Sequence, residues 1–240
     1  MFESMGPFLP IMIAGAIFGA IGALVSYRLK SKFKKYSDIP SQRGLSGKEI
    51  AEMMLRDRGI TDVKVTCVRG TLTDHYNPMN KTVNLSEPVY HGRNAAAAAV
   101  SAHECGHAVQ HATAYSWLTF RSKLVPVQNA SGMILNIIMM GSIFGGSLLY
   151  SVFPGDTIMY ILIATYGVLA LFSVVTLPVE FDASKRALAW IQDSGTATHE
   201  EIENSRDALK WAALTYVVAA VSAITTVLIL ILQLVGRSDD

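Results

Sequence analysis

Cysteine is scarce in this chain of 240 residues, which contains only Cys67 and Cys105. Two cysteines are too few for a disulfide framework, and their spacing is not that of a C-x-x-C motif. Charge is scarce too, because Asp, Glu, Lys and Arg make up 16% of the residues and hydrophobic residues 51%. The formal net charge of +1 is uninformative about partners, and nothing in the sequence suggests a nucleic-acid partner. Such a composition is typical of a protein with membrane spans, and membrane lipid is its first expected partner.

Four long runs lack charged residues and could each cross the roughly 30 Å hydrocarbon layer as a helix. They cover residues 7–27, 129–153, 157–179 and 211–235. A Pro-Gly-Asp turn joins the second run to the third, which predicts a transmembrane hairpin. A cleaved signal peptide is the alternative for the first run. We expect a permanent anchor, since its positive charges follow it and it exceeds an h-region of about 7–15 residues. A channel or transporter is disfavoured, because transport paths usually carry ionisable residues inside their spans.

Lysine and arginine are distributed unequally across these predicted spans. Of the 20 such residues, 19 lie in segments 28–128 and 180–210, and Arg237 is the exception. Cytoplasmic flanks of membrane spans carry an excess of Lys and Arg. Both segments are therefore predicted to face the cytoplasm.

The strongest motif is the pentapeptide His103-Glu104-Cys105-Gly106-His107, which follows an alanine-rich run typical of a helix. A spacing of four residues places the two histidines on one helix face, so both imidazoles point at one spot. H-E-x-x-H is the zinc-binding pattern of metallopeptidases, in which the glutamate takes a proton from water. We predict one Zn²⁺ per chain, with His103 and His107 as ligands and Glu104 as catalytic base. Cys105 points away from that face and is expected to be a small buried side chain.

A catalytic zinc usually has a third protein ligand. The metzincin pattern would require glycine at 110 and histidine at 113, where this chain has Gln110 and Thr113, so that class is excluded. Glu180 is preferred, because it lies at the exit of a predicted span on the same side as the motif and opens the next predicted helix. A carboxylate that merely stabilises a helix start is its alternative role. The other candidates are Asp182, His111, His199, His75 and His91.

Short soluble elements are predicted before the motif. A capping box formed by Ser46 and Glu49 begins an amphipathic helix. Residues 60–68 and 81–86 have the pattern of strands, and residues 74–80 that of a turn. In many zinc peptidases an edge strand beside the active-site helix pairs with extended substrate. Strand 81–86 could have that role or be an ordinary sheet strand.

These patterns together predict an α-helical membrane protein with four transmembrane helices and a small α+β cytoplasmic zincin-like catalytic domain. The predicted divisions are an N-terminal anchor at 1–29, the cytoplasmic domain with the motif helix at 30–128, the transmembrane hairpin at 129–179, a cytoplasmic helical segment with the third ligand at 180–210, and a C-terminal transmembrane helix at 211–240.

Four motifs in this order resemble the YugP-type membrane zinc metallopeptidases. They are H-Y-N-P before K-T-V-N-L-S, then H-E-C-G-H-A-V-Q-H, then the hairpin, then P-V-E-F-D-A-S-K-R-A. That family is similar in plan to the HtpX-type membrane proteases, in which a glutamate after a transmembrane hairpin is the third ligand. The resemblance covers essentially the whole chain. It implies a gluzincin-like endopeptidase of the bacterial plasma membrane, with Glu180 as ligand, unfolded or membrane-associated protein substrates, and a task in membrane-protein quality control.

One position departs from the wider group of proteases with a glutamate ligand. There an aspartate four residues after that glutamate often orients a zinc-binding histidine. Position 184 here is serine, and the aspartate is at 182. Either Asp182 takes this role with altered geometry, or another carboxylate or a carbonyl does. Candidates for contacts with substrate or with the oxyanion are Arg186, His75, Tyr76 and His91.

A zinc-binding membrane partner or scaffold protein without protease activity is the alternative function. The intact Glu104 argues against it, because a closed structural zinc site needs no base beside a water. Manganese or cobalt could occupy the same ligands, but zinc is the default for two histidines and a carboxylate.

Overall fold

The computed structural model describes residues 9–144 and 155–238 and divides the chain into two compact units. The first unit comprises Met1–Ala23, Phe120–Thr176 and Tyr216–Asp240. The second comprises Leu24–Thr119 and Leu177–Thr215 and holds all the residues of the predicted metal site. The domain divisions drawn from the sequence stay a prediction.

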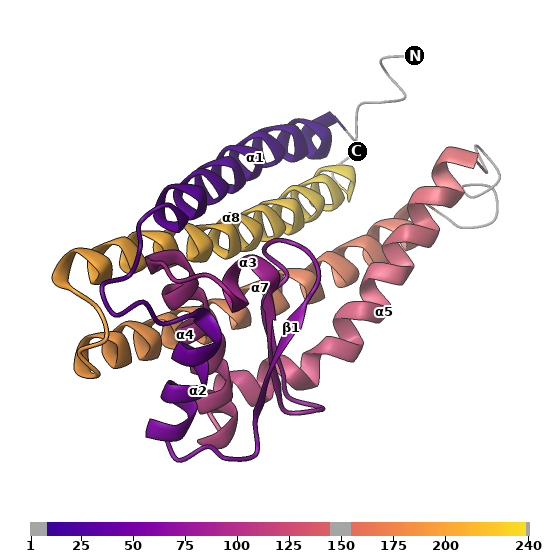
Figure 1. The fold of residues 1–240 in the computed structure, drawn as a ribbon. Coiled ribbons are helices and arrows are strands. Elements are labelled where there is room, and N and C mark those ends of the chain that lie inside the picture. Colours follow the sequence, from indigo (N-terminus) through magenta and orange to yellow (C-terminus); the bar gives the residue numbers. More distant parts are fainter. Residues whose placement is uncertain (1–8, 145–154, 239–240) are drawn as a thin grey trace. The chain divides into compact units, whose positions relative to one another are not determined.

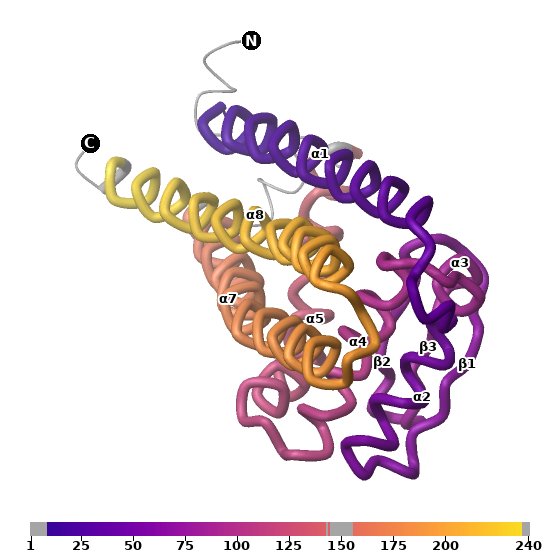
Figure 2. The backbone as a smooth tube through the Cα atoms, turned by 60° about the vertical axis from the view of Figure 1, so that its left-hand side comes forward, coloured from indigo at the N-terminus to yellow at the C-terminus, as the bar shows by residue number. Residues whose placement is uncertain are grey.

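The first unit is built from apolar helices. Four helices contain a segment long and apolar enough to cross a membrane, namely α1 (Leu9–Ser37), α5 (Ser116–Phe144), α7 (Gly155–Asp193) and α8 (His199–Ser238). Large apolar side chains on them are exposed, Met133 to 67% and Leu232 to 71%. Such extensive apolar exposure marks a surface that lipid or protein covers. In this unit α1 and α8 lie side by side in both views (Figures 1 and 2).

All four helices extend beyond the predicted spans, and α5 and α7 do so in ways that bear on the site. Helix α5 begins at Ser116, within the segment predicted to be cytoplasmic, and contains Pro126. Helix α7 continues through Pro178 to Asp193, so Glu180 lies in a helix interior. The prediction that Glu180 opens a new helix was therefore wrong. Pro154 of the predicted turn lies outside the described residues.

The second unit contains a three-stranded sheet with the order β1-β3-β2. Strand β1 (Lys64–Val68) pairs parallel to β3 (Thr82–Ser86), and β2 (His75–Asn77) pairs antiparallel to β3. The predicted first strand thus begins later than residue 60. Strand β3 is central, so of the two roles left open for residues 81–86 that of an ordinary sheet strand holds. The edge strand beside α4 is β2, which falls inside the turn predicted at 74–80, so the prediction of a turn there was wrong for these three residues.

Helix α4 (Ala95–Ala112) runs through the centre of this unit and contacts α2 (Gly47–Asp57), α3 (Glu87–Tyr90), β2 and β3. Asn94 Oδ1 caps its first turn by accepting a hydrogen bond from Ala97 N at 2.9 Å. Cys105 is fully buried in the core, with its Sγ 3.5 Å from Ala51 O, as predicted for a small buried side chain. Packing on all sides therefore holds the motif helix in place.

The predicted capping box of α2 is confirmed. Ser46 N donates to Glu49 Oε2 at 2.6 Å, and Glu49 N donates to Ser46 Oγ at 3.2 Å. Two backbone N–H groups that the helix itself leaves unpaired are thereby satisfied.

Replacing Ser46 with alanine should lower the free energy of unfolding by about 1 kcal/mol, because the helix loses its cap. Ser46→Asp can still accept the hydrogen bond from Glu49 N and should keep most of that stability. Denaturation of the detergent-purified variants measures both. Equal losses in the two variants would contradict a capping role.

Candidate metal centre

Helices α4 and α7 touch at a glycine of the motif. A Cβ atom added to Gly106 would lie 2.5 Å from the carbonyl oxygen of Ala183 and 3.0 Å from its Cα. Any side chain at position 106 would therefore push the two backbones apart. Glycine at this position lets α7 approach the motif face of α4 closely enough for Glu180 to reach both histidines.

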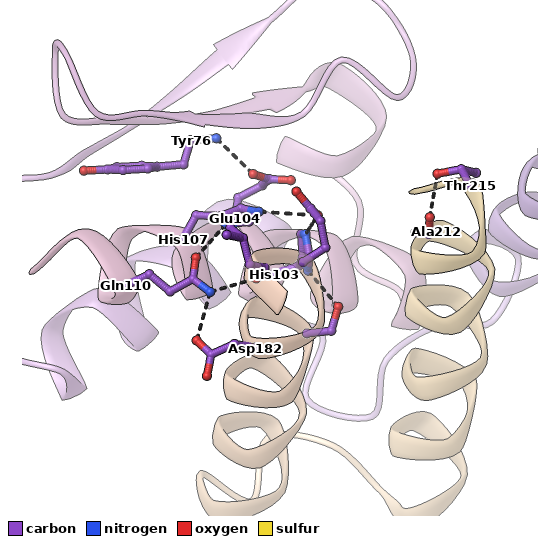
Figure 3. Close-up of polar contacts among 11 residues, drawn as sticks. Tyr76, His103, Glu104, His107, Gln110, Asp182, Ala212 and Thr215 are labelled. Atoms are coloured by element: carbon purple, nitrogen blue, oxygen red, sulfur yellow. Dashed lines mark hydrogen bonds and ion pairs between the residues drawn. The ribbon is translucent and has the colours of Figure 1, made fainter. Parts of the chain in front are cut away.

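Three side chains converge where the helices meet. Glu180 Oε2 lies 3.3 Å from His103 Nε2 and 3.7 Å from His107 Nε2. One ligand atom from each residue lies within 4.8 Å of the others. The side chains of His103 and His107 are 12% and 10% exposed, and that of Glu180 is 4% exposed. The structure thus brings together the three residues that the sequence predicted as metal ligands (Figure 3 shows the histidines).

This arrangement fits a zinc ion. Bonds of about 2.0–2.1 Å at tetrahedral angles place ligand atoms about 3.4 Å apart, close to the observed separations. Two imidazole nitrogens and a carboxylate oxygen are a ligand set of catalytic zinc sites, which keep a fourth position open. The same donors also accept other divalent transition metals.

The charge of Glu180 acts directly on His107. Burial opposes the charged imidazolium, but the hydrogen bond and the charge of Glu180 outweigh burial and raise the pKa of His107. A buried carboxylate thus attracts positive charge to the point where the two Nε2 atoms meet. A metal ion bound there would take the place of the proton.

Gln110 orients His107 through Nδ1, the ring nitrogen that does not face Glu180. Its Nε2 donates to Val179 O and to Asp182 Oδ2, each at 2.8 Å. Since both partners are acceptors, the amide nitrogen must face them, and Gln110 Oε1 faces His107 Nδ1 at 3.0 Å. His107 then carries its hydrogen on Nδ1 and presents an unprotonated Nε2 to a metal. Sequence reasoning missed this residue, although it lies three positions after His107 on the same helix.

Ser184 contacts the corresponding ring nitrogen of His103. Its Oγ lies 3.1 Å from His103 Nδ1. The serine that departs from the expected aspartate thus contacts a motif histidine directly. Asp182 does not join the group of possible metal ligands, and it reaches His107 only through Gln110, while also accepting from Arg186 Nε at 2.5 Å. Asp182 therefore contacts a motif histidine only indirectly, through Gln110.

Glu104 lies beside the centre under strand β2. Its Oε2 accepts a hydrogen bond from Tyr76 N at 2.9 Å, and the residue is 8% exposed. Asp74 fixes the start of this strand by accepting hydrogen bonds from Ser86 N at 2.7 Å and Ser86 Oγ at 3.0 Å. Burial raises the pKa of Asp74, despite these hydrogen bonds. These hydrogen bonds hold strand β2 in place beside Glu104.

The other histidines lie outside the possible metal-binding group. His75, His91 and His199 are exposed. His75 Nδ1 lies 2.9 Å from Thr73 O, and His91 packs edge-on against Tyr90. His111 is exposed and hydrogen-bonded to Tyr76 Oη at 2.7 Å. Arg186 is paired with Asp182 and lies over the Tyr115 ring, 5.7 Å from its centroid.

Replacing Gln110 with alanine should weaken zinc binding about 10- to 100-fold, because His107 loses the partner that fixes its tautomer. Competition with a chromophoric chelator measures the affinity. His111→Ala is the matched control, since that histidine lies one turn along the same helix and bonds to Tyr76 instead. Equal affinity in the Gln110→Ala variant and the wild type would exclude the orienting role.

Comparison with known proteins agrees with this geometry. The family described as "Putative neutral zinc metallopeptidase" matches residues 11–235. The chain is 37% identical over 233 residues to "Putative membrane protease YugP" of Bacillus subtilis (strain 168), a match that covers 97% of this chain and 98% of the relative. No solved structure matches. The chain belongs to this family of zinc metallopeptidases.

Proposed function

We propose that the chain is a membrane-bound, gluzincin-like zinc endopeptidase that binds one zinc ion through His103, His107 and Glu180. One observation carries the proposal: two imidazole nitrogens and a buried carboxylate converge beside a second glutamate. A structural zinc site has no use for Glu104 at this position. Family membership supports both the metal and the reaction class.

Each residue then has a defined task. Zinc held by the three ligands would polarise the scissile carbonyl and lower the pKa of the attacking water towards ~7. Glu104 accepts the proton from that water and later delivers it to the leaving amine. The hydrogen bond from Tyr76 N to Glu104 Oε2 holds the carboxylate in place while its other oxygen acts on the proton. Gln110 and Ser184 keep the Nε2 atoms of both histidines directed at the metal.

Strand β2 is the part of the sheet that suits an extended substrate. It is an edge strand, and Tyr76 N donates to Glu104 rather than to β3. A peptide added along this edge would pass directly over the catalytic base. The substrate-pairing role that was one of two alternatives for strand 81–86 is therefore proposed for residues 75–77 instead.

The membrane assignment rests on the four apolar helices and on the similarity to a protein named as a membrane protease. We propose a multi-pass protein of the bacterial plasma membrane whose catalytic segments, 30–128 and 180–210, face the cytoplasm as a zincin-like domain. The excess of lysine and arginine in these segments supports that orientation. Glu180 directly follows a predicted span along the chain, which suits unfolded or membrane-associated proteins as substrates, as in membrane-protein quality control.

Glu104→Gln should abolish cleavage of an unfolded protein while zinc content stays near one per chain, because the amide cannot accept the proton. We expect kcat to fall at least about 100-fold. Glu52→Gln, an exposed glutamate of α2, is the matched control and should cleave as the wild type does. If the wild type binds zinc but cleaves none of a panel of unfolded and membrane-associated substrates, the partner or scaffold function is favoured instead.

Cys67 reports the orientation in the membrane. It is exposed, whereas Cys105 is buried, so a maleimide should label Cys67 selectively. A membrane-impermeant maleimide should leave Cys67 unlabelled in intact spheroplasts and label it after lysis. Cys67→Ser corrects for background labelling. Labelling in intact spheroplasts would contradict a cytoplasmic domain.

A further inference from the structure

A small pocket lies next to the catalytic base on the same face of α4. It has a volume of about 150 Å³. The lining residues are Ile60, Asp62, Val63, Tyr76, Lys81, Ala108, His111 and Ala112. Glu104, Ala108, His111 and Ala112 share one face of the helix, since they are spaced by three or four residues. The pocket thus begins one helical turn beyond Glu104.

Tyr76 connects the pocket to the reaction centre. Its backbone N–H donates to Glu104, and its side chain forms a wall of the pocket. The phenol is fixed there by the hydrogen bond between Tyr76 Oη and His111 Nδ1 at 2.7 Å. Figure 3 shows the Tyr76 ring directed away from Glu104 along the helix. A peptide lying along β2 would therefore have a side chain within reach of the pocket.

The pocket has the size and chemistry for one uncharged side chain. Its volume is well below the roughly 300 Å³ of small-molecule sites. Ile60, Val63 and Ala108 supply apolar surface, and the small side chains of Ala108 and Ala112 leave the space open. The formal charges at the pocket belong to Asp62 and Lys81, which pair at 2.5 Å. Because these charges compensate each other, the lining has no net formal charge with His111 neutral.

We propose that this pocket binds an apolar side chain of the substrate, of the size of leucine or phenylalanine, close to the scissile bond. The inference rests on the proposed peptidase function and adds its substrate preference. Ala108 and Ala112 set the size of the accepted side chain. The Asp62–Lys81 pair makes the pocket select an uncharged side chain.

Ala112→Leu and Lys81→Ala test these two determinants in the full-length, zinc-loaded protein. Cleavage sites in a mixed peptide library, mapped by mass spectrometry, should show large apolar residues enriched at one position near the scissile bond. Ala112→Leu fills the pocket and should lower the ratio of leucine to alanine at that position about 10-fold. Lys81→Ala leaves Asp62 unpaired and should raise cleavage at lysine or arginine there about fivefold. Ala189→Leu, at an exposed alanine of α7 outside the pocket, should leave the profile unchanged.

Binding supplies a readout that does not depend on turnover. In the Glu104→Gln background, fluorescence anisotropy should show that Ala112→Leu weakens binding of a leucine-containing peptide more than of its alanine counterpart. Cleavage by the wild type with a profile unchanged in both pocket variants would overturn the pocket assignment alone. Absence of cleavage by the wild type, with zinc bound, would overturn the proposed function and this inference with it.

Discussion

The close contact between α4 and α7 at Gly106 is the constraint on which the centre depends. The carbonyl oxygen of Ala183 lies where a side chain at position 106 would begin. This approach brings Glu180 Oε2 within 3.3 and 3.7 Å of the two motif histidines. In H-E-x-x-H the two positions marked x, here 105 and 106, do not bind the metal and are free to vary in that respect. Here one of them is Gly106, whose lack of a side chain allows the close approach of α7, the helix that carries the proposed third ligand Glu180.

Each helix contributes a pair of residues, spaced by four positions, that face the other helix across this contact. On α4, His103 and His107 are four residues apart, and on α7 so are Glu180 and Ser184. Glu180 faces the Nε2 atoms of both histidines, and Ser184 faces Nδ1 of His103. Gln110 completes the set by bridging His107 Nδ1 to Val179 O and Asp182. The ligands and the groups that orient them therefore come from the same two helices, which lets the packing of those helices determine the geometry of the site.

The sequence reveals those parts of the site that depend on local spacing. The motif on α4, the capping box at Ser46 and the four apolar helices follow from periodicity and local hydrogen bonding. Strand β2 was missed because three residues are too few to show alternation, and only pairing with β3 makes them a strand. The central position of β3 likewise depends on non-local pairing. Gln110 contacts His107 locally, three residues along α4, but the orientation of its amide depends on tertiary hydrogen bonds to Val179 and Asp182 of α7. Ser184 reaches His103 through a tertiary hydrogen bond, which spacing along the chain does not encode, although the serine at 184 was a visible departure from the expected aspartate.

X-ray absorption at the zinc K edge of the purified, zinc-loaded chain tests the centre most directly. Coordination by His103, His107 and Glu180 predicts only nitrogen and oxygen neighbours at about 2.0–2.2 Å, with the outer-shell scattering of two imidazoles. Replacing Glu180 with alanine should change this first shell, while both imidazole signals persist. A sulfur neighbour at about 2.3 Å, or a spectrum that Glu180→Ala leaves unchanged, would contradict the assignment of the metal ligands.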